Sequence, residues 1–151
     1  MYDDIFFVKH TNLTNYPFYQ KGKLKDNQEG GEHYRQTLKN AEMVLKSNCF
    51  NTYNHELHVP CIYNIDKFRE MSFMFYVMKD DCQSAAVRSI YGNSFIENQP
   101  YRGDIKIKDK NTKVEDVIGV ADCFSCSDEA FDGNVLEFLK KEFPVKSRFE
   151  K

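Results

Sequence analysis

Apolar residues recur at helical spacing most clearly between residues 32 and 47. The stripe that predicts a helix there consists of Tyr34, Leu38, Ala41 and Leu45, widened by Met43 and Val44. Glu32 near the start and Lys46 near the end both suit the helix dipole, and Asn48 is a reasonable stop. We expect this helix to pack against the core rather than to carry a functional site.

Three further helices are expected from similar patterns. Asp66 is predicted to cap a helix that runs to about Lys79. That helix is apolar on nearly all sides, which indicates that it is buried or lies under another element. Residues 84–91 favour a short helix, followed by a turn signal at Gly92-Asn93. A final amphipathic helix is marked by four apolar residues and a terminating proline: Val135, Leu136, Leu139, Phe143 and Pro144.

Strands are expected in the remaining apolar stretches. Ile5 to Val8 is a short β-branched and aromatic run, which is typical of a buried strand. Residues 104–108 alternate between polar and apolar, as a half-exposed strand does, and residues 18–24 and 117–124 are further candidates. The expected elements mix helices and strands without an internal repeat, and we expect a single α/β domain over residues 1–151.

Composition and charge narrow the class of protein. The 151 residues are 41% hydrophobic and 29% charged, as in soluble globular proteins. The net charge is −2 and the basic residues are spread out, which argues against nucleic-acid binding. No apolar run approaches the roughly 18–20 residues of a membrane span. Five cysteines without a secretory signal favour free thiols in the cytoplasm: Cys49, Cys61, Cys82, Cys123 and Cys126.

Two adjacent carboxylates, Asp3 and Asp4, stand directly before the first expected strand. Adjacent acids repel each other, so the pair needs solvent, hydrogen-bond donors or a cation. Hard oxygen ligands beside a rigid strand suit Mg²⁺ or Mn²⁺, which keep bound waters and bind substrate phosphates. The alternative is a solvated stretch with two exposed acids, and the dipeptide by itself favours that alternative.

Several segments, in chain order, carry a resemblance to a known family. They are Tyr2-Asp3-Asp4-Ile5-Phe6-Phe7, Tyr53 to Pro60, Arg88 to Asn93, Phe124 to Asp128, and Phe143 to Ser147. With these segments the chain resembles the C-terminal half of glycosyltransferase-like proteins of phages and bacteria. Those proteins are distantly similar to Stealth-type capsular polysaccharide phosphotransferases. The chain departs from the family pattern at Cys126, where Thr is expected, and at Tyr2, where Asn is expected.

The resemblance implies the metal-binding and acceptor half of a nucleotide-diphospho-sugar transferase fold of the GT-A type. The implied activity is divalent-cation-dependent transfer of a sugar or sugar phosphate from a nucleotide-activated donor to an acceptor hydroxyl, such as that of a glycan. By the same resemblance Asp3, Asp4 and His58 would hold Mn²⁺ or Mg²⁺. His58 and Asp128 would be catalytic, and Arg88 would grip the diphosphate of the nucleotide sugar.

The family carries a βαβ nucleotide-binding region before the acidic stretch, and this chain starts at that stretch. We therefore expect the chain alone to show little or no transferase activity. It should self-associate or pair with a separate N-terminal partner chain. The alternative is a non-catalytic fragment or binding module of the same fold.

Each of these residues also has an ordinary structural interpretation. His58 stands before Pro60, as in the family, and would share a face with Glu56 if the segment is extended. Asp128 could form a capping box with Ser125 instead of facing an acceptor. Arg88 has a fork that matches phosphate oxygens, but pairing with a surface acid is the more frequent role of such a residue.

A different constellation of residues suits a structural zinc ion. Cys123 and Cys126 form a Cys-x-x-Cys pair, and His55 and His58 would complete four ligands. The two pairs are far apart in the sequence, unlike those of compact zinc modules. For His55 we favour a capped or solvent-facing side chain in a polar loop. A zinc-stapled interaction domain is therefore a further alternative.

Overall fold

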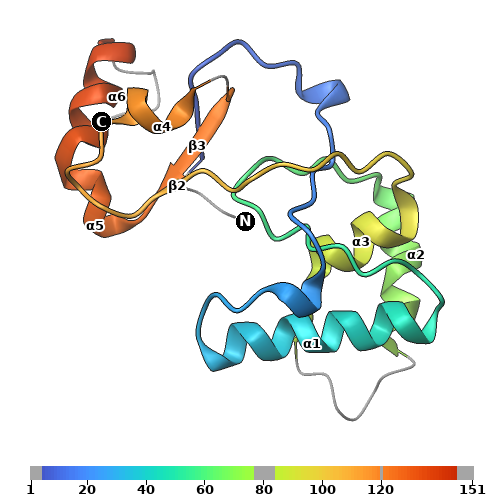
Figure 1. The fold of residues 1–151 in the computed structure, drawn as a ribbon. Coiled ribbons are helices and arrows are strands. Elements are labelled where there is room, and N and C mark those ends of the chain that lie inside the picture. The colour runs from blue at the N-terminus through green and yellow to red at the C-terminus, as the bar shows by residue number, and fades with distance from the viewer. Residues whose placement is uncertain (1–4, 77–83, 120, 146–151) are drawn as a thin grey trace. The chain divides into compact units, whose positions relative to one another are not determined.

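The computed structural model describes residues 5–76, 84–119 and 121–145 and divides the chain into two compact units. Unit 1 combines residues 1–12, 58–60 and 104–151, and unit 2 combines residues 13–57 and 61–103. Figure 1 shows the three longest helices in unit 2 and the strands in unit 1. The expectation of a single domain over the whole chain stays a prediction.

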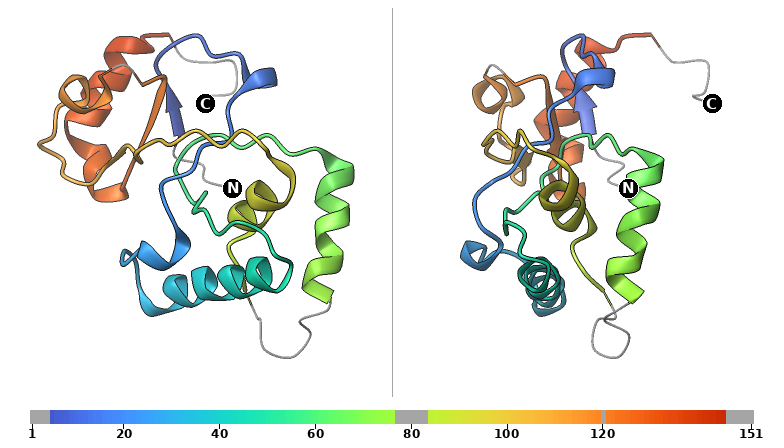
Figure 2. Two further views of the ribbon diagram at one scale, coloured as in Figure 1. Left: turned by 45° about the vertical axis from the view of Figure 1, so that its right-hand side comes forward. Right: turned by 90° about the vertical axis from the view of Figure 1, so that its right-hand side faces the viewer.

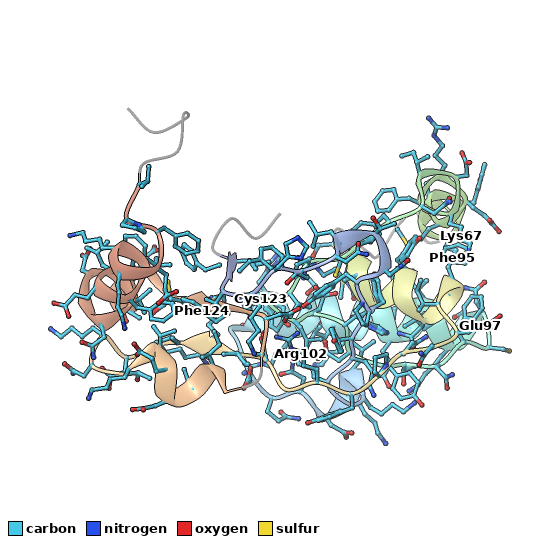
Figure 3. The ribbon with its side chains drawn as sticks, turned by 90° about the horizontal axis from the view of Figure 1, so that it is seen from above. Lys67, Phe95, Glu97, Arg102, Cys123 and Phe124 are labelled. Carbon is cyan, nitrogen blue, oxygen red and sulfur yellow. The ribbon has the colours of Figure 1, made fainter. Side chains whose placement is uncertain are left out.

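Unit 2 is helical. Its elements are α1 (Glu32–Ser47), α2 (Ile65–Tyr76), α3 (Val87–Phe95) and the short 3₁₀ turns η1 (Leu13–Asn15) and η2 (Leu24–Asp26). Helix α3 packs against both α1 and α2 (Figure 2). Lys67 of α2 lies over the ring of Phe95 at the end of α3, with 6.0 Å from Nζ to the ring centroid (Figure 3). The core between these helices includes Leu38, Val44 and Leu45 of α1 and Ile90 and Tyr91 of α3.

Helix α1 has the bounds that its apolar stripe predicts. Leu38, Ala41 and Leu45 are buried, and Val44 widens the stripe as expected. Met43 is 47% exposed, so its predicted place in the stripe is wrong. Asn48 ends the helix, as predicted, and its side-chain Nδ2 donates to the Val44 carbonyl oxygen at 2.8 Å.

Helix α2 differs from its prediction at the start and along its surface. The cap is Asn64 rather than Asp66, because Asn64 Oδ1 accepts from the backbone N–H groups of Asp66 and Lys67 at 3.0 and 3.1 Å. Met71 is buried, but Phe73 is 72% exposed. The many apolar residues of α2 therefore do not imply that the helix is buried on all sides. The predicted end at Lys79 lies outside the described residues.

Helix α3 continues through Gly92-Asn93, so the predicted turn there is wrong. Gly92 is needed for close packing, because an added Cβ would lie 2.6 Å from His55 Cδ2 and 2.7 Å from Phe18 Cε1. Asn93 holds Tyr53 by its side chain: Oδ1 accepts from the Tyr53 N–H at 2.9 Å, and Nδ2 donates to the Tyr53 carbonyl at 2.8 Å. Both residues are selected by tertiary contacts rather than by a chain reversal.

The predicted strand over residues 18–24 is also absent from unit 2 as described. The segment makes isolated bridges, Gln20 with Tyr101 and Lys23 with Tyr53, and then enters η2 at Leu24. Single bridges satisfy its backbone without forming a ladder.

Unit 1 is built on a three-stranded sheet with the order β1-β3-β2. The strands are β1 (Ile5–Phe7), β2 (Lys106–Ile107) and β3 (Cys123–Cys126). Strand β1 pairs with β3 antiparallel, and β2 pairs with β3 parallel. The helical elements of the unit are α4 (Val114–Ile118), α5 (Asp128–Ala130), the π-helical turn η3 (Phe131–Val135) and α6 (Leu136–Glu142). The mixture of helices with a small sheet agrees with the predicted α/β class.

The two faces of this sheet differ in chemistry. In the register, Phe6 pairs with Phe124, and Ile107 pairs with Cys126. These four side chains belong to the core of unit 1 together with Ala130, Val135 and Leu139. The alternate positions Ile5, Phe7, Lys106, Cys123 and Ser125 therefore lie on the opposite face. Figure 3 labels Phe124 and Cys123, one residue from each face.

The predicted strands of unit 1 are confirmed in part. Strand β1 forms at the predicted run, but its residues are half-buried rather than buried. Strand β2 lies within residues 104–108 as predicted. The candidate over residues 117–124 is wrong for its first part, because α4 ends at Ile118 and β3 begins at Cys123.

The final helix also begins and ends close to its prediction. Val135 and Leu139 are buried as expected, while Phe143 is 54% exposed. The turn before α6 departs from helical geometry at Gly133. A Cβ at Gly133 would lie 2.2 Å from the Lys110 carbonyl oxygen, which instead accepts from the Asn134 N–H at 3.1 Å. Within the described ranges, no helix is long and apolar enough to cross a membrane.

Candidate functional site

Three polar side chains of unit 1 form a hydrogen-bonded chain at the start of β2. Asp104 Oδ2 lies 2.7 Å from His58 Nδ1, and Asp104 Oδ1 accepts from the His58 backbone N–H at 2.8 Å. Lys106 Nζ lies 3.2 Å from His58 Nε2. The side chains of His58 and Asp104 are 16% and 18% exposed, so the chain is shielded but not sealed from solvent. We call these three residues the Asp104–His58–Lys106 array.

The partners of the imidazole decide which nitrogen carries the proton. A lysine ammonium has only donors, so Nε2 accepts from Lys106. The proton of the neutral ring then lies on Nδ1 and is donated to the Asp104 carboxylate. Asp104 also holds the His58 backbone, and these two hydrogen bonds fix both the tautomer and the orientation of the ring.

This arrangement suits proton transfer next to an anion. A carboxylate-oriented histidine with a basic Nε2 is the usual general base for a hydroxyl group. The ammonium of Lys106 supplies a positive charge at the same nitrogen, where it would attract a phosphoryl or carboxylate group. The array therefore joins a base and an anion-attracting group within one hydrogen-bonded chain.

Ser125 of β3 belongs to the same side of the sheet as Lys106. The two residues are cross-strand partners in the β2–β3 register, so their side chains share a face. Ser125 is fully buried, and its hydroxyl has no hydrogen-bond partner in the described structure. A buried hydroxyl without a partner costs about 1–3 kcal/mol. Such a group in a native protein calls for an explanation.

Unit 2 holds a second buried polar cluster, centred on Glu56. Glu56 Oε1 accepts from the backbone N–H and the hydroxyl of Ser89, both at 3.1 Å. Ser89 Oγ also accepts from the His55 N–H at 3.0 Å. Burial raises the pKa of Glu56, and the Ser89 hydrogen bonds and the charge of Arg88 only partly offset this. These contacts tie α3 to the loop between α1 and α2, and we assign them a structural role.

His55 is a buried packing residue, not a solvent-facing side chain of a polar loop. It is 1% exposed, its ring lies 5.1 Å from that of Phe18, and its Nδ1 donates to the Tyr19 carbonyl at 2.7 Å. Burial lowers the pKa of His55, against the hydrogen bonds to Tyr19 and Gln99.

Of the remaining candidates from the sequence, Arg88 and Asp128 lie within the described residues, and neither belongs to the array. Asp3 and Asp4 lie outside the described residues. Arg88 is in unit 2, where its guanidinium donates to the Leu57 carbonyl oxygen. Asp128 is exposed at the first position of α5. The roles expected for these four residues stay predictions.

The capping box expected between Ser125 and Asp128 is wrong. Ser125 lies inside β3, and the residue that precedes α5 is Ser127, which makes no side-chain cap. The strand extends two residues further than the composition indicated, because Cys126 fills the core of unit 1.

Two further expectations concern the face shared by Glu56 and His58 and the four zinc ligands. Glu56 and His58 were expected to share a face, but the Leu57 N–H donates back to the His55 carbonyl at 2.9 Å, which interrupts the extended chain between them. For zinc, Cys123 and Cys126 lie on opposite faces of β3, and His55 belongs to unit 2. No group of three or more metal-ligating side chains occurs among the residues that the structure describes.

Sequence reasoning identified His58 but missed Asp104, Lys106 and Ser125. Asp104 is 46 positions from His58, so no local motif connects them. Lys106 was read only as the polar position of an alternating strand. A Ser within an apolar strand was the available signal for Ser125, but it was attributed to a helix cap.

Comparisons with protein-family models, with curated proteins and with solved structures find no match for this chain. The function of this protein is therefore inferred from the residues of the chain itself.

Proposed function

We propose that this protein transfers a sugar or sugar phosphate from a nucleotide-activated donor to an acceptor hydroxyl. The observation that carries the proposal is the Asp104–His58–Lys106 array, in which a carboxylate-oriented imidazole lies beside an ammonium group. The resemblance of several segments to glycosyltransferase-like proteins supports the same reaction class. His58 is the residue on which both lines of argument meet.

In this proposal each member of the array has a distinct role. His58 Nε2 accepts the proton of the acceptor hydroxyl as that oxygen bonds to the transferred group. The bond between that group and the nucleotide breaks, and the nucleotide phosphate leaves with its electron pair. Asp104 is a positioning residue that holds the ring and stabilises the imidazolium that forms. Lys106 leaves Nε2 for the anionic donor group, which exposes the base when the donor is bound.

A divalent cation fits the described residues poorly. His58 is the one predicted metal ligand that the structure describes, and its Nε2 faces the Lys106 ammonium, which would repel a cation. The proposed roles of His58, Asp104 and Lys106 therefore involve no metal ion. The predicted Mn²⁺ or Mg²⁺ site rests on Asp3 and Asp4, and calorimetry with Mn²⁺ on wild type and an Asp3→Ala/Asp4→Ala variant tests it. Equal binding of Mn²⁺ by the two proteins would contradict the predicted metal site.

The reaction itself is tested with the full chain and a panel of nucleotide sugars. Donor consumption and product mass are followed over long incubations, because we expect slow turnover by the chain alone. His58→Ala should reduce the rate about 10²–10⁴-fold, the usual contribution of a general base. The matched control is His33→Ala, which removes an exposed histidine of α1.

Two results would contradict the proposed function. The first is turnover that His58→Ala and Asp104→Asn leave at the wild-type rate. The second is the absence of both turnover and calorimetric binding with every nucleotide sugar, with and without added cation, which would favour a non-catalytic binding module instead.

A further inference from the structure

We infer that the sheet face carrying Lys106 and Ser125 is a binding subsite for phosphoryl oxygens, in which the Ser125 hydroxyl donates a hydrogen bond to the anion. The inference rests on the proposed function only for the natural ligand, the diphosphate of a nucleotide-activated donor. The subsite itself is argued from the geometry of unit 1.

The first step is the placement of the two side chains. Lys106 and Ser125 are directly paired across β2 and β3, and the Ser125 N–H donates to the Ile105 carbonyl at 2.9 Å, which fixes this register. Their side chains therefore project from neighbouring positions on one face. The other face is closed by the apolar core of unit 1, so only the Lys106 face has polar groups for a ligand.

The second step is the unpartnered hydroxyl. Ser125 is 0% exposed and its Oγ has no hydrogen-bond partner in the described structure, although most buried hydroxyls have one. The neighbouring positions on the same face, Ile5 and Cys123, carry apolar side chains, so an apolar side chain could also occupy this strand position. A hydroxyl retained without a partner is explained if its partner is a ligand oxygen.

The third step is the charge that would bring an anion to this hydroxyl. Lys106 is half-buried, and one of the three donors of its ammonium is directed to His58 Nε2. Both oxygens of Asp104 accept hydrogen bonds from His58, which orients the only carboxylate of the array toward the histidine. Movement of the Lys106 ammonium toward an anion would release His58 Nε2.

The phosphoryl class follows from the number and type of donors. A hydroxyl and an ammonium on adjacent strand positions can hold two oxygens of one tetrahedral group. Lys is a frequent phosphate-binding residue because its charge needs no fixed planar geometry. A planar carboxylate is better matched by the fork of an Arg, which this face does not supply among its described positions.

Calorimetric titration with inorganic pyrophosphate tests the subsite directly. The full chain is compared with Ser125→Ala and Lys106→Met, and each should bind pyrophosphate about tenfold or more weakly, as expected for the loss of a hydrogen bond to a charged group. The matched controls are Ser127→Ala and Lys108→Met. Each control residue lies two positions after the tested residue in the sequence. Ser127 is half-buried and Lys108 is exposed, and both controls should stay within about twofold of wild type.

A second measurement separates ligand binding from a folding defect. The ¹⁵N resonance of His58 Nε2 should shift on pyrophosphate addition, because the anion withdraws Lys106 from that nitrogen. Ser125→Thr keeps the hydroxyl and should retain most of the binding, whereas Ser125→Ala should stay folded by circular dichroism and lose it. Absence of pyrophosphate binding by wild type would overturn the subsite, and so would equal weakening in the Ser127 and Lys108 controls.

The outcomes also separate this inference from the proposed function. Pyrophosphate binding that depends on Ser125 and Lys106, with neither binding nor turnover of any nucleotide sugar, would support the subsite and contradict the transferase. Turnover that depends on His58, combined with pyrophosphate binding that ignores Ser125 and Lys106, would support the transferase and overturn the subsite.

Discussion

Ser89 and Ser125 are both fully buried, but their hydroxyls are in opposite situations. Ser89 Oγ donates to Glu56 and accepts from the His55 backbone, so it joins α3 to the loop between α1 and α2. Ser125 Oγ has no partner in the described structure. At the scale of a single residue, the first hydroxyl stabilises the fold and the second weakens it unless a ligand is bound.

We predict opposite effects of alanine at these two positions. Ser125→Ala should raise the free energy of unfolding by about 1 kcal/mol, because it removes a buried group that makes no hydrogen bond. Ser89→Ala should lower it by about 1–3 kcal/mol, because Glu56 and the His55 N–H lose their partner. Urea denaturation at pH 7 measures both. A Ser125→Ala variant that is clearly destabilised would indicate that the hydroxyl has a structural partner in solution.

Glu56 makes the stability of the protein depend on pH. Burial raises the pKa of Glu56 above its ordinary value of 4.5, so the folded state holds this proton at pH values where the unfolded state has lost it. Stability from the protonated carboxyl is therefore fully present below about pH 4.5 and is lost as pH rises through the folded pKa.

Glu56→Gln should remove this pH dependence. The amide keeps an oxygen that can accept from Ser89, and it carries no charge to bury. We expect the variant to gain stability relative to wild type as the pH is raised from 4 to 7, measured by urea denaturation at each pH. Glu97→Gln, at an exposed position, is the control and should not change the slope. A difference between Glu56→Gln and wild type that is constant with pH would contradict a raised pKa.

Residue types alone located only part of the candidate site. His58 could be selected from the sequence because histidine is a common metal ligand and the natural base near neutral pH, and because it stands before Pro60. Asp104 and Lys106 could not be connected to it, because the contact depends on bringing β2 next to a segment 46 residues earlier. Ser125 could not be recognised as unpartnered, since a missing hydrogen bond is a property of the folded surroundings.

At the scale of elements, prediction succeeded where the local pattern and the tertiary contacts agree. Helix α1 has both an apolar stripe and suitable ends, and its bounds were predicted correctly. The helix expected over residues 84–91 forms as α3, but the turn expected at Gly92-Asn93 does not. Only the end of the strand expected over residues 117–124 forms, as the start of β3. Packing overrides local preference at Gly92 and Asn93. Gly92 and Asn93 usually indicate a turn, but here the first admits the His55 ring and the second binds the Tyr53 backbone.

The packing at Gly92 leads to a prediction about α3. Ala normally stabilises a helix interior by about 1 kcal/mol relative to Gly. At Gly92 the new Cβ would lie 2.7 Å from His55 Nε2 and from Phe18 Cε1, both in buried rings. Gly92→Ala should therefore destabilise the protein by about 1–3 kcal/mol or more, measured by urea denaturation.

Gly103→Ala provides the comparison, because a Cβ there meets no atom within 4 Å. It should be neutral or stabilising by up to about 1 kcal/mol. A Gly92→Ala variant as stable as wild type would show that the two rings can move apart without cost.

At the scale of the whole molecule, the chain supports two separate cores. The core of unit 2 is formed mainly by α1 and α3, and the core of unit 1 by the sheet with α5, η3 and α6. The order of segments along the chain does not follow the units, since residues 58–60 belong to unit 1 while both flanking segments belong to unit 2. Hydrophobic patterns identify which faces are buried, but they do not say which core a face joins.

We predict that substitutions in the two cores act locally. Leu45 and Leu139 are buried in unit 2 and unit 1 respectively, and replacing either by Ala should cost about 2–5 kcal/mol within its own core. Native-state hydrogen exchange measures where that cost appears, because amides open in cooperative groups whose free energies report local stability.

Leu139→Ala should lower protection in β3 and α6 more than in α1, and Leu45→Ala should lower protection in α1 and α3 more than in β3. The matched residue type removes differences in side-chain chemistry between the two variants. We expect a measurable difference because unit 1 is assembled from three separate segments of the chain. Pairing of its strands closes long loops that contain the segments of unit 2. An equal loss of protection in both units from either substitution would show that the two cores unfold as one cooperative structure.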